Sequence, residues 1–325
     1  MVAAHPALVS VVIPAYNAES TIAAQLDALA AQQADVPFEV LVCDNGSTDA
    51  TRSVALSFAA SIPRLRVVDA SARRGPAAAR NIGVSQAAAE RVLFCDADDI
   101  VGDGWLERMA SALLDDVEVA AGTLEGRSLN TANRYSVSWE VSGDIRLAFW
   151  PRFRATASSN LGVRKDVFDE AGGFDELLLT CEDLDFCWRV QLAGHPLVFV
   201  TDAVVHSRQR DGLGAVFRQA RSYAAGTRAL RYKYSAIATA DVDPPAPAAV
   251  TPPGGDGGAH DAGAAASGRV ARGLSRVGRI FTRTGQANIA WRLGEALGKR
   301  FGRIDPRIRP LPVSLLDRHL AGGSQ

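Results

Sequence analysis

The sequence predicts an α/β fold, in which a mostly parallel sheet is flanked by helices and followed by a C-terminal helical extension. Short runs of β-branched and other apolar residues alternate with helical patterns over the first hundred residues, which is typical of strand–helix–strand units with parallel strands. Polar clusters directly follow three of these runs. The chain has 325 residues and is 47% apolar, so it can bury a large core.

Four buried strands are expected in the first part of the chain, at residues 8–13, 38–43, 65–68 and 91–95. Between the first two, residues 20–31 place apolar side chains on one helical face. A second helix is expected near residues 50–59. A third begins at Gly75 and Pro76, because proline in a first helical turn gives up no hydrogen bond. The ligands of such a sheet lie at the carboxyl ends of its strands.

The near-neutral net charge of −1 hides an uneven distribution. Residues 269–303 hold nine Lys or Arg and one acid, Glu295, so this segment carries +8 and the rest of the chain −9. Residues 241–268 hold five Pro, six Gly and eight Ala but no Lys, Arg, Leu or aromatic residue. Such a composition cannot bury enough apolar surface to order itself. We therefore expect a body, a disordered Pro/Gly/Ala linker (237–268) and a basic tail (269–325).

The start of the basic tail has the pattern of an amphipathic helix. Its apolar stripe is Val270, Leu274, Val277 and Phe281, and its basic stripe is Arg272, Arg276, Arg279 and Arg283. Such a helix is suited to peripheral contact with an anionic membrane through residues 269–303. The alternatives are that it packs on the catalytic body or binds a partner.

Composition also excludes several classes of protein. A balanced charge argues against a protein that coats nucleic acid, which needs a strong basic excess. No run of about 20 apolar residues predicts a transmembrane helix, and the N-terminus has no pattern of a secretory leader. We expect a cytoplasmic protein, with the basic tail as its contact with the inner face of the membrane. The four cysteines lack zinc-site spacing and are expected as reduced core thiols.

The polar cluster after the fourth strand contains Asp96, Asp98 and Asp99. Three carboxylates in four residues repel one another unless a cation lies among them, and oxygen-only ligation suits Mg²⁺ or Mn²⁺. A solvated acidic turn or helix cap is the alternative. An EF-hand loop is excluded, because Ile100 and Val101 occupy positions that require a ligand and a glycine. The sequence has neither the dinucleotide-binding glycine motif nor a P-loop.

A second acidic group, Glu182, Asp183 and Asp185, opens a helical pattern. Acids at a helix N-terminus are ordinarily caps and dipole partners. The functional alternative is a general base, because Glu182 and Asp185 on either side should raise the pKa of Asp183 above its ordinary value near 3.9.

Five motifs occur in a fixed order over residues 9 to about 206, and they resemble the family 2 glycosyltransferases of the GT-A fold. They are VSVVIPAYNAESTI, FEVLVCDNGSTDAT, RGPAAARNIGVSQA, RVLFCDADD and ASSNLGVRKDVFDEAGGFDELLLTCEDLDFCWRVQLAG. The resemblance implies a Rossmann-like GT-A fold and inverting transfer of a sugar from a nucleotide-diphosphate donor to an acceptor hydroxyl. It divides the body into a nucleotide-sugar-binding half (1–105) and an acceptor-binding, catalytic half (106–236).

The resemblance also implies roles for individual residues. The base and ribose would contact Pro14, Ala15, Tyr16, Glu19, Asp44, Asn45 and Asp96, and Arg80 would contact the nucleotide or pair with an acid of the sheet edge. Asp98 would bind a divalent cation, Mn²⁺ or Mg²⁺, with His206 as a further metal or diphosphate contact. Asp183 would deprotonate the attacking hydroxyl, and Glu182 would shape the acceptor side.

The chain departs from the family pattern at two points. Many members have Asp where this chain has Asn45, which bears on the donor base; a UDP-sugar is the favoured donor. The Gln-x-x-Arg-Trp motif of processive synthases is missing after Asp183, which favours addition of a single sugar. The expected acceptor is a glycan or a lipid-linked acceptor of cell-envelope polysaccharide, glycolipid or glycan synthesis.

Two other functions compete with this interpretation. A sugar nucleotidyltransferase shares the fold, but it carries a glycine-rich basic loop after the first strand, where this chain reads PAYNAES. A non-catalytic sugar-nucleotide-binding scaffold is the other alternative, and the presence of both Asp98 and Asp183 argues against it.

Overall fold

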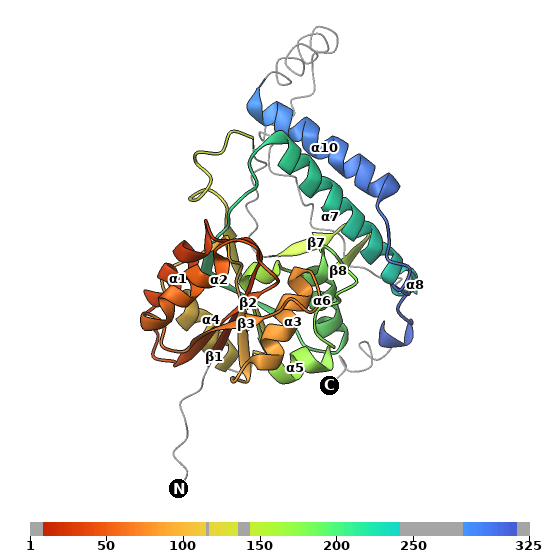
Figure 1. Cartoon of the computed structure of the whole chain (residues 1–325). Coiled ribbons are helices and arrows are strands. Elements are labelled where there is room, and N and C mark those ends of the chain that lie inside the picture. The colour runs from red at the N-terminus through yellow and green to blue at the C-terminus, as the bar shows by residue number, and fades with distance from the viewer. Residues whose placement is uncertain (1–8, 115–116, 136–143, 241–281, 317–325) are drawn as a thin grey trace, which may run out of the picture.

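The computed structural model describes residues 9–114, 117–135, 144–240 and 282–316 (Figure 1). Its centre is an eight-stranded sheet with the order β3-β2-β1-β4-β9-β6-β10-β5. Helices cover both faces of this sheet, so the predicted α/β architecture is confirmed. None of the described helices is long and apolar enough to cross a membrane.

The N-terminal strands form a parallel unit, as the sequence predicts. They are β1 (Val9–Ala15), β2 (Phe38–Asp44), β3 (Leu65–Asp69) and β4 (Arg91–Phe94). The register aligns Ala15 with Asp44 and Val12 with Phe94, so the three polar clusters that follow β1, β2 and β4 meet at one edge. The helices between these strands are α1 (Ile22–Ala30), α2 (Thr51–Leu56) with a 3-10 turn (Ser57–Ala60), and α3 (Pro76–Gln86).

The second half of the sheet mixes directions. β9 (Leu161–Arg164) pairs antiparallel with both β4 and β6 (Val119–Glu125), and β10 (Leu197–His206) pairs parallel with β6. The short strand β5 (Ile100–Val101) closes the edge against β10. β7 (Ile145–Leu147) and β8 (Trp150–Ala155) form a separate hairpin.

Two apolar cores lie on opposite faces of the sheet, because alternate strand residues face opposite sides. One core packs under α1, α2 and α4 (Trp105–Leu114). The other packs under α3, α5 (Lys165–Glu170) and α6 (Glu182–Leu192), and it holds Trp150 and Trp188 in edge contact. The four cysteines are free thiols, as expected, and three of them are buried.

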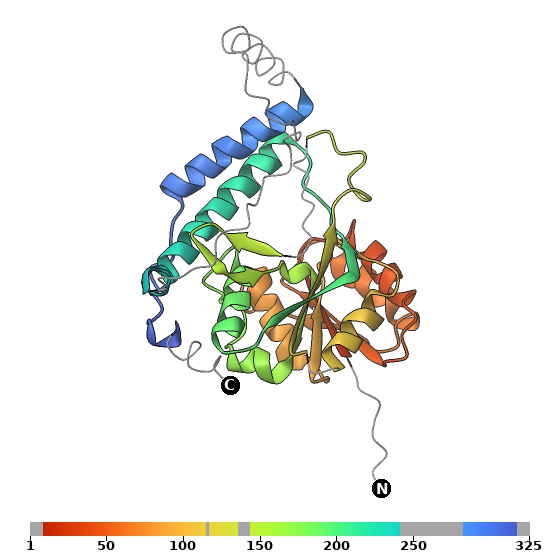
Figure 2. The same cartoon turned by 180° about the vertical axis from the view of Figure 1, so that it is seen from behind.

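The C-terminal extension is a parallel helix pair, α7 (Leu213–Lys233) and α10 (Arg283–Phe301), which lie side by side in both views (Figures 1 and 2). Glycines of α10 permit the close approach: a Cβ at Gly298 would lie 2.3 Å from the carbonyl oxygen of Arg221. The amphipathic membrane helix was predicted at the start of the basic tail. Residues 269–281, which contain its apolar stripe, lie outside the described residues. The segment that follows, α10, packs on α7; whether the stripe of residues 270–281 binds a membrane, the body or a partner stays a prediction.

Helix α8 (Ser235–Ala240) follows α7 and extends four residues into the segment expected as linker. The remainder of that segment, residues 241–268, lies outside the described part of the chain. The division of the body into two functional halves stays a prediction.

Candidate functional site

A cleft of about 1350 Å³ runs along the carboxyl edge of the sheet. One wall is formed by the segments after β1 and β4, and the loop after β10 adds residues 207–210. The start of α6 forms the facing wall, and α7 and α10 contribute the far end. The carboxyl edge of a parallel sheet is where such folds bind ligands, so this cleft is the candidate active site.

The acidic cluster after β4 lies in this cleft. Asp96, Asp98 and Asp99 all line it, and the side chain of Asp98 is 39% exposed. Burial raises the pKa of Asp98, and the nearby charge of Asp96 raises it further. Burial and the same neighbour also raise the pKa of Asp99. Burial and mutual repulsion therefore disfavour the ionised forms of these carboxylates, and a bound cation would offset that effect.

The acidic cluster fits a divalent cation only as a partial site. Among the described residues, no group of three or more His, Cys, Asp or Glu side chains converges as a metal cage. Mg²⁺ and Mn²⁺ commonly take one or two carboxylates and complete their shell with water and substrate phosphates. Hard oxygen donors of Asp98 beside an open cleft satisfy that requirement.

The buried side chain of Arg80 joins the two acidic groups. Its Nη2 donates to Oδ1 of Asp96 at 2.6 Å, and its Nη1 donates to Oε1 of Glu182 at 3.0 Å. Of the two roles expected for Arg80, the structure supports pairing with an acid of the sheet edge. The guanidinium thereby ties the strand that carries the acidic cluster to the start of α6.

Asp183 stands at the first turn of α6 and lines the cleft. Its Oδ1 accepts from the Leu184 amide at 2.8 Å and its Oδ2 from the Ser158 amide at 3.3 Å. Burial, and then the charge of Glu182, raise its pKa to about 7, against the lowering effects of those amides and of Arg80. A carboxylate with this pKa is well matched to proton transfer near neutral pH.

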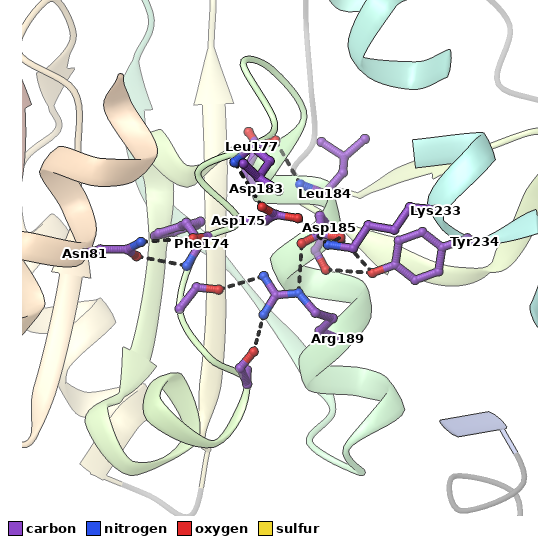
Figure 3. Close-up of polar contacts among 12 residues, drawn as sticks. Asn81, Phe174, Asp175, Leu177, Asp183, Leu184, Asp185, Arg189, Lys233 and Tyr234 are labelled. Carbon is purple, nitrogen blue, oxygen red and sulfur yellow. Dashed lines mark hydrogen bonds and ion pairs between the residues drawn. The ribbon is translucent and has the colours of Figure 1, made fainter. Parts of the chain in front are cut away.

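The prediction that Asp185 helps to raise the pKa of Asp183 is wrong. Asp185 is fully buried on the other side of α6, where it accepts from Arg189 Nε at 2.8 Å and Tyr234 Oη at 3.0 Å and pairs with Lys233 Nζ at 2.7 Å (Figure 3). Burial alone would raise its pKa, but the charges of Arg189 and Lys233 lower it. Asp185 therefore anchors α6 to the body.

Some of the residues expected to hold the base and ribose line the cleft, and others do not. Pro14, Ala15, Tyr16 and Asn45 line the cleft. Asn45 is held rigidly, since its Nδ2 donates to the carbonyls of Ala70 and Arg73 and its Oδ1 accepts from the Gly75 amide.

Glu19 and Asp44 are absent from the described residues that line the cleft. Both order backbone instead: Oε2 of Glu19 accepts from the Ala50 amide at 2.8 Å, and Oδ1 of Asp44 accepts from the Ser47 amide at 3.0 Å. Their contacts with a nucleotide stay predictions.

His206 ends β10, where its Nδ1 lies 2.8 Å from Oε2 of Glu125. It too is missing from the described lining of the cleft, so a role in metal binding stays a prediction. The next residues along the chain reach the acids instead. The Arg208 amide donates to Oδ1 of Asp99 at 2.8 Å, and Arg210 Nη2 lies 3.9 Å from Oδ2 of Asp98.

Sequence reasoning missed two groups of cleft residues. Arg208 and Arg210 follow the carboxyl end of β10, whose position comes from the structure. The second group lies at the far end of the cleft on α7 and α10: Tyr223, Arg231, Trp291, Glu295 and Lys299. Tyr223 and Trp291 meet edge to face, with ring centroids 6.3 Å apart. No local pattern places α10 at the cleft, because that depends on tertiary packing.

The mixed sheet flanked by helices, with acids at its carboxyl edge, agrees with the GT-A fold. A profile of the glycosyl transferase family 2 matches residues 10–178, just over half of the sequence. The chain belongs to glycosyl transferase family 2.

Two curated relatives and one solved structure agree with this assignment. The chain is 31% identical to glycosyltransferase AglE of Haloferax volcanii over 201 residues, which is 60% of this chain and 65% of AglE. It is 36% identical to the succinoglycan biosynthesis protein ExoO of Rhizobium meliloti over 189 residues, 54% of this chain and 53% of ExoO. It thus spans less than two thirds of either relative.

The solved structure is that of the mannosyltransferase PcManGT from Pyrobaculum calidifontis in complex with GDP-Man and Mn²⁺. It superposes with a TM-score of 0.54 over 99% of this chain and 80% of PcManGT, at 20% identity. This similarity confirms the fold.

Proposed function

We propose that this chain transfers one sugar from a nucleotide-diphosphate sugar to an acceptor hydroxyl, with inversion at the anomeric carbon. In this reaction the acceptor oxygen bonds to the anomeric carbon as the bond from that carbon to the diphosphate oxygen breaks. The nucleoside diphosphate leaves, and the acceptor proton passes to the protein. Family membership and the relatives AglE and ExoO support glycosyl transfer in glycan or cell-envelope polysaccharide synthesis.

The position of Asp183 carries the proposal. Its carboxylate lines the cleft opposite the acidic cluster and has a pKa of about 7, so about half is ionised at neutral pH and ready to accept a proton. Arg80 fixes the spacing of the two walls, because it holds Asp96 on one and Glu182 on the other. A base on one wall and the leaving group on the other suit attack from the face opposite the diphosphate.

Asp98 is the residue that would hold Mn²⁺ or Mg²⁺, supported by Asp96 beside it. When bound, such a cation supplies positive charge that stabilises the diphosphate leaving group. PcManGT, which has the same fold, is described with Mn²⁺. Arg208 and Arg210 line the cleft near Asp98 and would add positive charge for the same phosphates.

We favour a UDP-sugar as the donor. A relative from Escherichia coli, 37% identical over 107 residues, is named as a UDP-glucose-dependent glucosyltransferase, whereas PcManGT is described with GDP-Man. Both Nδ2 protons of Asn45 are donated to the carbonyls of Ala70 and Arg73, and its Oδ1 accepts from Gly75, so Asn45 offers a base only the second lone pair of Oδ1. A thermal-shift comparison of UDP with GDP in Mn²⁺ tests the choice, and stronger stabilisation by GDP would overturn it.

The far end of the cleft is the proposed acceptor site. Tyr223 and Trp291 offer the aromatic surface on which sugar rings pack, and Arg231 offers a cation for an anionic acceptor. This combination suits a sugar that is carried on a phosphate, as in a lipid-linked acceptor. Comparing a free sugar with the same sugar on a lipid diphosphate tests this, and equal kcat/KM for the two would contradict it.

The function is tested by incubating the full chain with nucleotide sugars and acceptor in Mn²⁺ and assigning the product anomer by NMR. An inverted anomer is expected, and Asp183→Asn should lower turnover by about 10²–10⁴-fold, the range that general base catalysis supplies. Asp27→Asn, an exposed carboxylate on α1, is the matched control and should keep full turnover. Retention of configuration, or near-wild-type turnover of Asp183→Asn, would refute the mechanism. Release of pyrophosphate from a nucleoside triphosphate and a sugar phosphate would indicate a nucleotidyltransferase instead.

A further inference from the structure

Helix α10 carries an apolar stripe that faces solvent. Ile289, Leu293, Leu297 and Phe301 recur every four residues and are 39%, 57%, 40% and 60% exposed. Residues four apart lie on the same side of a helix, so the four side chains form one continuous strip along its length. Large apolar side chains exposed singly are ordinary, but an aligned row of four marks a contact surface.

The stripe is separate from the two other surfaces of α10. The packed face consists of Gly294 and Gly298, which lie against the backbone of α7. A second side, with Trp291 and Lys299, lines the catalytic cleft. The stripe is therefore not needed to hold α10 in place, and the cleft lies on a different side of the same helix.

The helix pair that presents the stripe is strongly basic. α7 contains five cations and no acid, and α10 contains four cations and one acid, so the pair has a formal charge of +8. On α10, Arg292 and Arg300 are exposed and are sequence neighbours of stripe residues. The acid Glu295 is paired with Lys299 at 2.5 Å. Exposed apolar side chains flanked by exposed arginines suit a surface that is both apolar and anionic.

A second copy of this chain fits the stripe poorly. A two-fold interface brings the same patch of each copy together, so the arginines that flank the stripe in one copy would lie near those of the other. A stable dimer also buries about 20–30 residues on each side, far more than this row of four. An anionic bilayer has neither problem, because it accepts a narrow apolar strip and attracts the arginines.

We propose that α10 lies in the surface of an anionic membrane, with Ile289, Leu293, Leu297 and Phe301 inserted among the acyl chains and Arg292 and Arg300 at the phosphates. The cleft side of the helix then opens next to the headgroups. This extends the proposed function, because it would present a lipid-linked acceptor directly to the far end of the cleft. The membrane contact itself does not depend on catalysis.

The test measures binding of the full chain to vesicles by co-sedimentation, without donor or acceptor. Wild type is expected to pellet with vesicles of phosphatidylglycerol and phosphatidylcholine, to bind phosphatidylcholine alone at least tenfold more weakly, and to dissociate as salt rises. The double variant Leu293→Glu/Leu297→Glu is expected to lose at least tenfold in partitioning. Leu56→Glu, 49% exposed on α2, introduces a like change elsewhere and should bind as wild type.

Circular dichroism and thermal melts establish that both variants fold, and donor hydrolysis in vesicle-free solution should be equal in all three proteins. The proposal is overturned if wild type does not bind phosphatidylglycerol vesicles at low salt, or if the double variant binds them equally. It is also overturned if light scattering shows a dimer that the double variant dissociates, since the stripe would then join two copies. If wild type hydrolyses no donor, the proposed function is refuted. The membrane proposal is then decided by the vesicle-binding result alone.

Discussion

The ionisation of Asp183 should control both the rate and the stability of this protein. Its pKa of about 7 means that raising the pH from 6 to 8 increases the ionised fraction from about one tenth to about nine tenths. Because only the ionised form accepts the acceptor proton, kcat/KM should rise about tenfold over this interval. Initial rates with radiolabelled donor, measured at saturating Mn²⁺ and low substrate, give this profile.

The same pKa has a consequence for folding, with the opposite sign. The folded-state pKa of Asp183 exceeds its ordinary value of 3.8, so the native state binds the proton more tightly than the unfolded state between about pH 4 and pH 7. Stability therefore falls as pH rises through that window. At about 1.4 kcal/mol for each pKa unit, ionised Asp183 destabilises the fold at pH 8 by at most about 4 kcal/mol.

Asp183→Asn separates the two effects. The variant should be nearly inactive, yet at pH 8 its melting temperature should exceed that of wild type by several °C, and the difference should vanish near pH 4. Differential scanning calorimetry across this pH range measures the effect. A flat rate profile between pH 6 and pH 8, or an Asn variant that is less stable at pH 8, would refute the role assigned to burial and to Glu182.

Three further predictions concern the cleft and its supports. Asp98→Ala should abolish the Mn²⁺-dependent part of UDP binding, seen by calorimetry with and without Mn²⁺, and unchanged affinity would remove Asp98 from the metal site. Asp185→Ala leaves Lys233 buried without its partner on α6 and should lower the free energy of unfolding by about 3–5 kcal/mol in urea titrations; a loss below about 1 kcal/mol would contradict the anchoring role. Gly298→Leu should force α10 away from α7 and speed hydrogen exchange of the α10 amides. Ala296→Leu, on the exposed side of α10, should leave that exchange unchanged. Equal exchange rates in the two variants would show that close packing of the helices is not required.

The parallel half of the fold was predictable because each signal was local. Alternating apolar runs located β1 to β4, and the rule that ligands meet the carboxyl ends of strands brought Asn45 and Asp96 to one edge. β9 was not predicted, because its insertion between β4 and β6 depends on pairing with strands far away in sequence. The position of α10 is of the same kind: its glycines matter only once α7 lies against them.

The error at Asp185 has a simple geometric cause. Neighbouring acids in a sequence were treated as neighbours in space, but residues two apart on a helix point about 200° away from each other. Asp183 consequently faces the cleft, while Asp185 faces the body and forms ion pairs with Arg189 and Lys233. Glu182, which is adjacent in sequence, does raise the pKa of Asp183, so that part of the prediction is confirmed. The main cause, burial, required the structure.

The uneven charge of the sequence corresponds to charged regions in different places of the fold. The described helices α7 and α10 together carry +8, and the rest of the chain carries −9. The acidic cluster lines the cleft at the sheet edge, and cations of α7 and α10 line its far end. A nucleotide-diphosphate sugar is anionic, so the acidic edge alone would repel it. Under the proposed function, the positive charge of the helices would attract such a donor into the cleft, and a divalent cation at Asp98 would remove the remaining repulsion. Donor binding should therefore weaken with salt even at saturating Mn²⁺, because the contribution of the helices is screened while that of a bound cation is not.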